Sequence, residues 1–145
     1  MKRYLMRHAA AEPAGEGGDR HRPLTSEGRR QAEEAGRALC ERGDSLRRVL
    51  TSPYLRARET ARLVAGQFAP PLPIEVREGI SAGAAPSQFA DAADEAVDLL
   101  VGHMPDLAIF VQQATGESLS FRPATICCLE IDGAAKIVWV RHPEG

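Results

Sequence analysis

Short apolar runs alternate with amphipathic segments along most of the 145-residue chain. Apolar runs of about 4–8 residues are typical of buried strands, whereas apolar residues that recur at positions i, i+3 and i+4 indicate helices. Strict alternation of the two favours a mostly parallel sheet with helices packed on its faces. We therefore predict one α/β domain over residues 1–145, with three layers (α/β/α), a mostly parallel central sheet and a C-terminal β-hairpin.

Local signals place the boundaries of these elements. Thr25 is a typical N-cap for the first helix, and Gly43 is a natural stop for it. Ser52 and Pro53 are expected to begin the second helix, as N-cap and first helical residue. A short helix is expected at 87–94, and another follows residue 105 and ends near residue 115. The predicted strands lie at 2–6, 48–51, 74–77, 96–101, 125–131 and 136–140, with a hairpin turn at 132–133.

Composition excludes several classes of function. The 18 basic and 20 acidic residues give a net charge of −2, without the basic excess that nucleic-acid-binding proteins usually carry. No apolar run approaches the ~20 residues that span a bilayer, so we expect a cytoplasmic protein without a membrane partner. The three cysteines contain no C-x-x-C spacing, so no structural zinc site is expected.

Three of the predicted strands end in polar residues just before a loop or a helix. The first strand runs into Arg7 and His8, the second into Ser52, and the fourth into His103. Ligands of open α/β sheets bind beyond the carboxyl ends of the strands. We therefore expect these side chains to meet at one rim, together with Arg56 from the first turn of the second helix.

This set of side chains suits a phosphoryl group. Arginine presents a planar fork of donors that matches phosphate oxygens, and helix N-termini add unpaired N–H groups. Histidine is the side chain that can be neutral and nucleophilic near neutral pH. No cluster of carboxylates or metal ligands competes for the role.

Five ordered motifs resemble the histidine phosphatase (phosphoglycerate mutase-like) superfamily, and most closely its short bacterial, SixA-type phosphohistidine phosphatase branch. A lone Arg-His pair is a weak signal, whereas five blocks in the family's order over nearly the whole chain are a strong one. The matching blocks are Leu5-Met6-Arg7-His8-Ala9, Arg22-Pro23-Leu24-Thr25 with Gly28, Ser52-Pro53-Tyr54-Leu55-Arg56-Ala57 with Glu59-Thr60-Ala61, Val101-Gly102-His103-Met104-Pro105, and Pro123-Ala124-Thr125.

The resemblance implies a metal-independent phosphatase that needs no cofactor. His8 would be the nucleophile that takes the phosphoryl group, and Arg7 and Arg56 would clamp its oxygens. His103 would be the second histidine of the pocket, donating to the phosphoryl oxygens when it is protonated. Ser52 is expected first to cap its helix, with a phosphate contact as a further role. Arg22 is expected at the substrate-binding rim or as a tie for its own loop, and Asp19 resembles a position common in the short branch.

The position of the general acid is where the chain departs from the larger members of the superfamily. Larger members of the superfamily carry a carboxylic acid in a long insertion, whereas the matching stretch here, 78–86, is short. Glu78 and Glu12 are the candidate acids. Expelling an alkoxide needs a positioned proton donor, which commonly contributes ~10²–10⁴-fold. Imidazole, with a pKa of ~6.5, leaves as a neutral base once its ring is protonated, so a site without a dedicated acid fits phosphohistidine better.

The leading hypothesis is therefore a phosphohistidine phosphatase that acts on a phosphorylated protein, such as a histidine phosphotransfer domain. Two alternatives stay open, a phosphatase of a small phosphomonoester and a non-catalytic module that binds phosphate or a phosphoprotein. A second Arg-His pair, Arg141-His142, follows the last strand, and we interpret it as part of a solvated tail.

Overall fold

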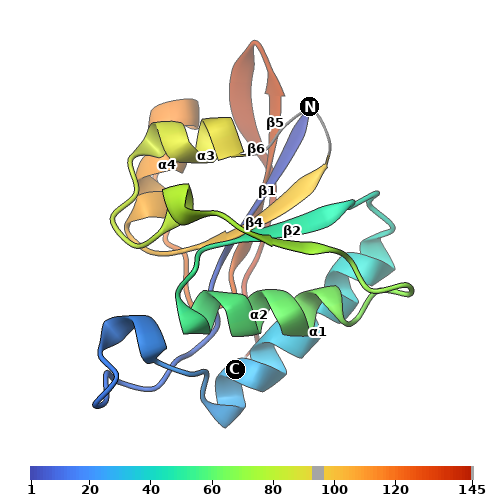
Figure 1. Ribbon diagram of the computed structural model, residues 1–145. Coiled ribbons are helices and arrows are strands. Elements are labelled where there is room, and N and C mark those ends of the chain that lie inside the picture. Colours follow the sequence, from blue (N-terminus) through green and yellow to red (C-terminus); the bar gives the residue numbers. More distant parts are fainter. Residues whose placement is uncertain (93–96, 145) are drawn as a thin grey trace.

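A computed structural model describes residues 1–92 and 97–144 and contains one six-stranded sheet of order β3-β2-β4-β1-β5-β6 (Figure 1). The strands are β1 (Lys2–Arg7), β2 (Arg48–Thr51), β3 (Ile74–Val76), β4 (Asp98–Gly102), β5 (Ile126–Asp132) and β6 (Ala134–Arg141). The helices are α1 (Ser26–Arg42), α2 (Leu55–Ala65), α3 (Pro86–Ala92) and α4 (Asp106–Thr115), and short 3-10 turns occupy η1 (Asp19–His21) and η2 (Glu78–Ile80).

The pairing of the strands confirms the predicted sheet. β1 to β4 are parallel neighbours, whereas β5 pairs antiparallel with both β1 and β6. The hairpin between β5 and β6 turns at Gly133, whose φ of 78° is a conformation that glycine adopts without steric cost. All four parallel strands therefore direct their carboxyl ends toward the same edge of the sheet.

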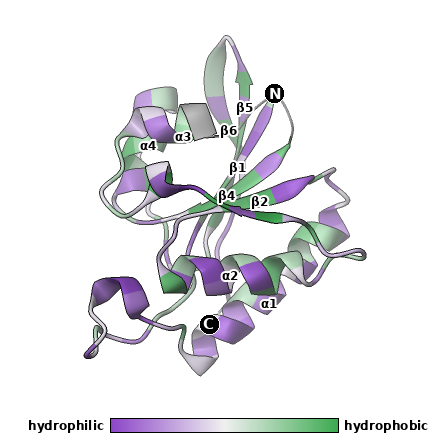
Figure 2. Cartoon of the chain, viewed as in Figure 1, coloured by the Kyte–Doolittle hydropathy of each residue, from purple (hydrophilic) through white to green (hydrophobic). Residues whose placement is uncertain are grey.

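Helices cover both faces of the sheet, as the three-layer prediction requires. α1 and α2 lie on one face, and α3 and α4 lie on the other (Figure 1). Successive side chains of β1 serve the two cores in turn, because a strand alternates its faces. Tyr4 and Met6 pack in the core beneath α1 and α2, and Leu5 packs in the core beneath α3 and α4. Figure 2 shows hydrophobic residues in the middle of the sheet and a mixture of hydrophilic and hydrophobic residues along α1 and α2.

The two signals around the first helix are confirmed. Thr25 is the N-cap of α1, and its Oγ1 accepts a hydrogen bond of 2.9 Å from the Gly28 amide. Gly43 ends the helix with a φ of 74°. Within the part of the chain that the structure describes, no helix is long and apolar enough to cross a membrane.

The predicted start of the second helix is wrong by two residues. Tyr54 is the N-cap of α2, and Leu55 is its first residue. Ser52 instead forms a turn, because its Oγ accepts the amide N–H of Tyr54 at 3.1 Å, two residues along the chain. Serine hydroxyls stabilise such turns as readily as they cap helices, so the N-cap predicted at Ser52 is wrong.

The predicted bounds of β2 and α4 are confirmed, and several other boundaries shift by one or two residues. β4 begins at Asp98, whereas the prediction began at residue 96, which lies outside the described residues. The expected short helix at 87–94 is α3, which the structure describes up to Ala92. Part of the expected loop at 78–86 forms η2. The last two strands extend beyond their predicted ends, to Asp132 and Arg141.

The start of α1 packs directly against the loop that leaves β1. A Cβ atom at Gly28 would lie 2.0 Å from the carbonyl oxygen of Ala10, which is backbone and cannot rotate away. The same carbonyl accepts the amide N–H of Thr25 at 3.0 Å. A glycine is therefore required where α1 meets the segment that follows His8.

We expect Gly28→Ala to destabilise the fold by about 3 kcal/mol, because the added methyl group forces backbone to move in a packed region. Gly43→Ala is the control: its Cβ meets open space, and only the left-handed backbone costs about 1 kcal/mol. Urea denaturation of both variants measures the two losses. Equal losses would contradict the packing argument.

Candidate active site

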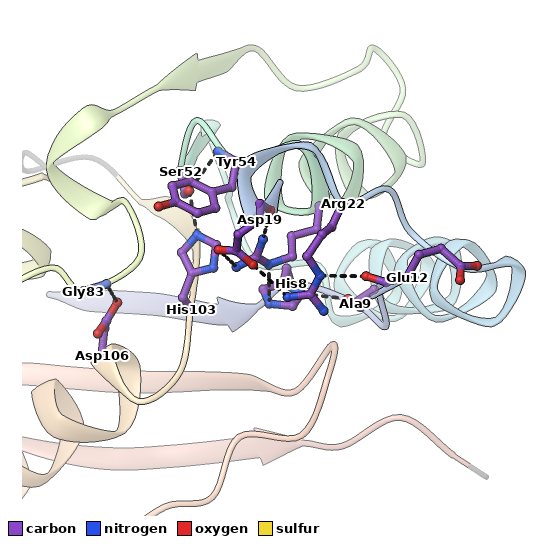
Figure 3. Close-up of polar contacts among 11 residues, drawn as sticks. His8, Ala9, Glu12, Asp19, Arg22, Ser52, Tyr54, Gly83, His103 and Asp106 are labelled. Atoms are coloured by element: carbon purple, nitrogen blue, oxygen red, sulfur yellow. Dashed lines mark hydrogen bonds and ion pairs between the residues drawn. The ribbon is translucent and has the colours of Figure 1, made fainter. Parts of the chain in front are cut away.

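Three strand ends meet at one edge of the sheet, as the sequence predicts. His8 follows β1, Ser52 follows β2 and His103 follows β4 (Figure 3). Backbone hydrogen bonds hold these ends in register, since the His8 amide donates to Gly102 O and the Ser52 amide donates to Val101 O, each at 3.1 Å. The two histidine rings lie 5.3 Å apart, centroid to centroid.

Two hydrogen bonds assign the protonation of the His8 ring. Its Nδ1 lies 2.8 Å from the carbonyl oxygen of Ala9, and its Nε2 lies 3.3 Å from Nε of Arg56. A carbonyl only accepts and a guanidinium only donates, so Nδ1 carries the hydrogen and Nε2 carries a lone pair. The lone pair of His8 therefore faces the guanidinium of Arg56.

The surroundings of His8 keep the ring neutral. Its side chain is buried, and burial is the main cause that lowers its pKa to about 4. The hydrogen bond to Ala9 O opposes this shift, whereas the positive charges of Arg56, Arg7 and Arg22 add to it. At neutral pH the nitrogen that faces Arg56 is therefore a free base.

Thr60 fixes the spacing between His8 and Arg56. Its buried Oγ1 accepts the amide N–H of Ala9 at 3.0 Å and donates to the carbonyl oxygen of Arg56 at 2.7 Å. One hydroxyl thus joins the residue after His8 to the helix that carries Arg56. This link places the side chains of His8 and Arg56 within hydrogen-bond distance of each other.

His103 is held by Ser52. Nε2 of His103 lies 2.7 Å from Ser52 Oγ, which also accepts the Tyr54 amide, and the Tyr54 ring packs edge-on against His103. Burial first, then the charges of His8 and Arg56, lower the pKa of His103 to about 3. Ser52 is completely buried and reaches the site through His103. Within the described ranges, Nδ1 of His103 is buried and has no hydrogen-bond partner.

Arg7 is anchored from the other side of the pocket. Its Nη1 donates to the carbonyl oxygen of Phe121 at 2.9 Å, and its amide donates to Thr125 O at 3.1 Å. Burial, followed by the charges of Arg56 and Arg22, lowers the pKa of its guanidinium. Its Nε is buried and finds no acceptor among the residues that the structure describes. Arg7 therefore has a donor to offer an anion beside His8.

The loop after β1 folds over the site through Asp19. Nη1 of Arg56 donates to the backbone oxygen of Asp19 at 2.7 Å, and Nη2 lies 3.3 Å from its carboxylate. Nη1 of Arg22 donates to the other carboxylate oxygen at 3.1 Å, and its Nε donates to Glu12 O at 2.7 Å. Arg22 thus ties its own loop together at the rim.

The structure does not bring either candidate general acid to His8. Glu78 is exposed in η2, and no contact joins its carboxylate to the site among residues 1–92 and 97–144. Glu12 is exposed as well, and its carboxylate points away from His8 (Figure 3). The loop at 78–86 is held instead by Asp106, whose Oδ2 accepts the Gly83 and Ala84 amides at 2.8 and 3.3 Å.

Sequence reasoning missed the roles of three neighbours. Thr60 joins the His8 and Arg56 segments, Asp106 holds the short loop, and Asp19 contacts Arg56. Only Asp19 carries a usable signal, since an acid three residues before Arg22 can pair with it in a tight turn. Thr60 and Asp106 depend on contacts between distant segments.

We expect the buried neutral His8 to make the fold less stable in acid. Its pKa of about 4 lies below the ordinary value of 6.5, so the unfolded chain binds a proton in this range that the folded chain does not. The stability contributed by His8 is complete above pH 6.5 and declines as pH falls toward 4. Between pH 7 and pH 4.5, the free energy of unfolding of wild type should fall by on the order of 2 kcal/mol more than that of His8→Gln. Chemical denaturation at the two pH values measures this difference. The free energy of unfolding of the exposed His21→Gln control should fall by the same amount as that of wild type. An equal fall in His8→Gln and wild type would contradict this expectation.

Comparison with known proteins points to one family. The model of the histidine phosphatase superfamily (branch 1) matches residues 3–82, which is more than half of the chain. A phosphohistidine phosphatase SixA homolog of Haemophilus influenzae is 35% identical, with 92% of this chain and 90% of that protein covered. An uncharacterized protein of Picosynechococcus sp. is 34% identical, with 94% of this chain and 88% of that protein covered.

Solved structures agree with this result. The protein histidine phosphatase SixA complexed with tungstate superimposes with a TM-score of 0.85 at 25% identity, covering 97% of this chain and 96% of that chain. A putative phosphohistidine phosphatase SixA from Agrobacterium tumefaciens gives a TM-score of 0.86 at 23% identity, over 99% and 98% of the two chains, and shares the fold. By family model, sequence and structure, this chain is a phosphatase that belongs to the histidine phosphatase superfamily.

Proposed function

We propose that the protein hydrolyses phosphohistidine on a protein substrate, through a phosphoryl group carried transiently by His8. The observation that carries this proposal is the tautomer of His8. Its Nδ1–H is engaged by Ala9 O, and its Nε2 lone pair is held toward the site by Arg56. A neutral imidazole with one unprotonated, oriented nitrogen is the form that attacks phosphorus once that nitrogen is released by Arg56.

The first chemical step is transfer to the enzyme. Nε2 of His8 attacks the phosphorus in line with the leaving group, and the bond between phosphorus and the substrate's imidazole breaks. As the Nε2 lone pair becomes a bond to phosphorus, Arg56 Nε–H loses its acceptor and becomes available to a phosphoryl oxygen. Arg7 Nε is a second donor on the same pocket, so the two arginines hold the charge of the transferring group.

The second step returns His8 to its starting form. Water attacks the phosphorus of phosphohistidine, the electrons of the P–N bond return to Nε2, and both protons of the water leave on the dihydrogen phosphate product. His103 is neutral in the free protein, but a phosphoryl group beside it favours the protonated ring. The Ser52 hydroxyl holds that ring in position for contact with the phosphoryl oxygens.

The positions of the two candidate general acids favour phosphohistidine over an alkyl phosphomonoester as the substrate. An alkoxide needs a proton on its departing oxygen, and both Glu12 and Glu78 are exposed and directed elsewhere. An imidazole leaves without a proton on the departing nitrogen, provided its other nitrogen is protonated. The relatives named SixA, one described as a protein histidine phosphatase, support the same substrate class.

We expect wild type to release phosphate much faster from a histidine-phosphorylated phosphotransfer domain than from an aryl phosphomonoester. His8→Ala should lose at least about 10³-fold on both, because it removes the attacking nitrogen. His142→Ala is a matched control, since it removes the histidine of the second Arg-His pair, and it should keep activity within about twofold. Phosphate release by wild type and both variants makes the comparison.

The outcomes separate the alternatives. Turnover of the monoester with no turnover of the phosphoprotein would indicate a small-molecule phosphatase. An inert wild type that still binds phosphate would indicate a binding module. Full activity in His8→Ala would overturn the site itself.

We also expect Glu12→Gln and Glu78→Gln each to change kcat with the phosphoprotein by less than about twofold. Loss of a general acid typically lowers the rate ~10²–10⁴-fold, so the two cases are well separated. A loss of that size in either variant would identify the missing acid and favour a phosphomonoester. Single-turnover measurements keep product release from masking the difference.

A further inference from the structure

Asp19 places a carboxylate beside two arginines at the exposed edge of the site, and phosphate binding does not explain it. Asp19 Oδ2 lies 3.3 Å from Nη2 of Arg56, and its Oδ1 lies 3.1 Å from Nη1 of Arg22. A negative charge beside a phosphate-binding arginine repels a phosphoryl dianion. By itself, this placement weakens the binding of every phosphorylated substrate, so another property of Asp19 must compensate.

Orientation of the arginines does not require this carboxylate. Arg56 already donates from Nη1 to the backbone oxygen of Asp19 at 2.7 Å. Arg22 already donates from Nε to the backbone oxygen of Glu12, also at 2.7 Å. Both bonds are shorter than those to the carboxylate, and both would survive replacement of the Asp19 side chain. The carboxylate is therefore available for another partner.

Asp19 is also open to a substrate. Its side chain is 55% exposed, whereas that of Arg56 is 6% exposed, so the carboxylate lies on the outer side of the clamp. It is close enough to His103 to act on the charge of that ring, and Figure 3 shows it between His103 and Arg22. In an in-line transfer the leaving group is on the side of the phosphorus opposite His8, and Asp19 is an exposed carboxylate at the edge of the site.

The carboxylate stays ionised. Its small degree of burial acts to raise its pKa, but the hydrogen bond from Arg22 and the charge of Arg56 outweigh burial, and the pKa of Asp19 is lowered. An ionised carboxylate accepts hydrogen bonds and does not donate a proton. Asp19 therefore does not serve an alkoxide, which needs a proton on the departing oxygen.

Phosphohistidine needs a different arrangement. Its phosphoryl group is on one ring nitrogen, and the proton that makes the ring a good leaving group is on the other. When His8 Nε2 forms its bond to phosphorus, the electrons of the old P–N bond return to the departing nitrogen. The distal N–H keeps its proton, and the ring leaves as neutral imidazole. A carboxylate facing the distal N–H stabilises the protonated ring before transfer.

We propose that Asp19 determines specificity for phosphohistidine by accepting a hydrogen bond from the distal N–H of the substrate's imidazole ring. This inference rests on the proposed function. It gives the carboxylate a partner that phosphohistidine has and a phosphomonoester lacks. For a monoester, Asp19 only repels the dianion.

The test compares wild type with Asp19→Asn on phosphoimidazole and on 4-nitrophenyl phosphate. Phosphoimidazole presents the leaving ring without a protein surface, and nitrophenolate leaves without a proton donor. We expect Asp19→Asn to lower kcat/KM about tenfold on phosphoimidazole, the size of one charge-assisted hydrogen bond. On 4-nitrophenyl phosphate we expect no decrease, or an increase, because a repulsive charge is removed.

Two further variants sharpen the comparison. Glu16→Gln removes an exposed carboxylate from the same loop and should leave the ratio of the two kcat/KM values unchanged. Asp19→Glu keeps the charge and should lie closer to wild type than Asp19→Asn. Retained turnover of 4-nitrophenyl phosphate shows that each variant is folded.

The outcomes distinguish this inference from the function on which it rests. A parallel loss on both substrates in Asp19→Asn would assign Asp19 to the arginine clamp and overturn its role in specificity, while the phosphatase assignment would stand. A wild type that hydrolyses 4-nitrophenyl phosphate but neither phosphoimidazole nor a phosphohistidine protein would overturn both.

Discussion

The hydrogen bond from Arg56 Nε to His8 Nε2 is the interaction around which the site is built. It exists only while the His8 ring is neutral and carries its hydrogen on Nδ1, which Ala9 O secures. Thr60 sets its length by joining the two segments, and the required glycine at position 28 lets α1 pack against the loop after His8. His8 and Arg56 are thus positioned as one unit.

Backbone carbonyl oxygens, rather than carboxylates alone, hold the three arginines around His8. Burial is the main cause of the lowered pKa values of Arg7 and His8, and the positive charges of the neighbouring arginines add to it. Carbonyl oxygens of Phe121, Asp19 and Glu12 each accept one guanidinium N–H. Carbonyl oxygens carry no net charge, whereas the Asp19 carboxylate offsets part of the charge of Arg56 and Arg22. The remaining positive charge is available to a phosphoryl group.

The sequence predicted the fold class, the strand order along the chain and the convergence of His8, Ser52 and His103, because these follow from apolar periodicity and from the geometry of parallel strands. It placed the start of α2 wrongly, since a serine followed by a proline suits both a cap and a turn. It did not identify Thr60 or Asp106, whose hydrogen bonds join segments separated by more than 20 residues. Such contacts leave no local pattern. Asp19 was noticed by its position, but its contact with Arg56 depends on how the loop folds back.

The most direct test of the account is the tautomer of His8 in the free protein. Two-bond ¹H–¹⁵N correlation spectra of ¹⁵N-histidine-labelled protein at pH 7 separate the two neutral forms from imidazolium, and His8→Gln assigns the signal. The account predicts a neutral ring with its hydrogen on Nδ1 that stays neutral well below pH 6, because burial and the nearby arginines lower its pKa to about 4. A ring protonated on Nε2, or an imidazolium at pH 7, would have no lone pair facing Arg56 and would contradict the account.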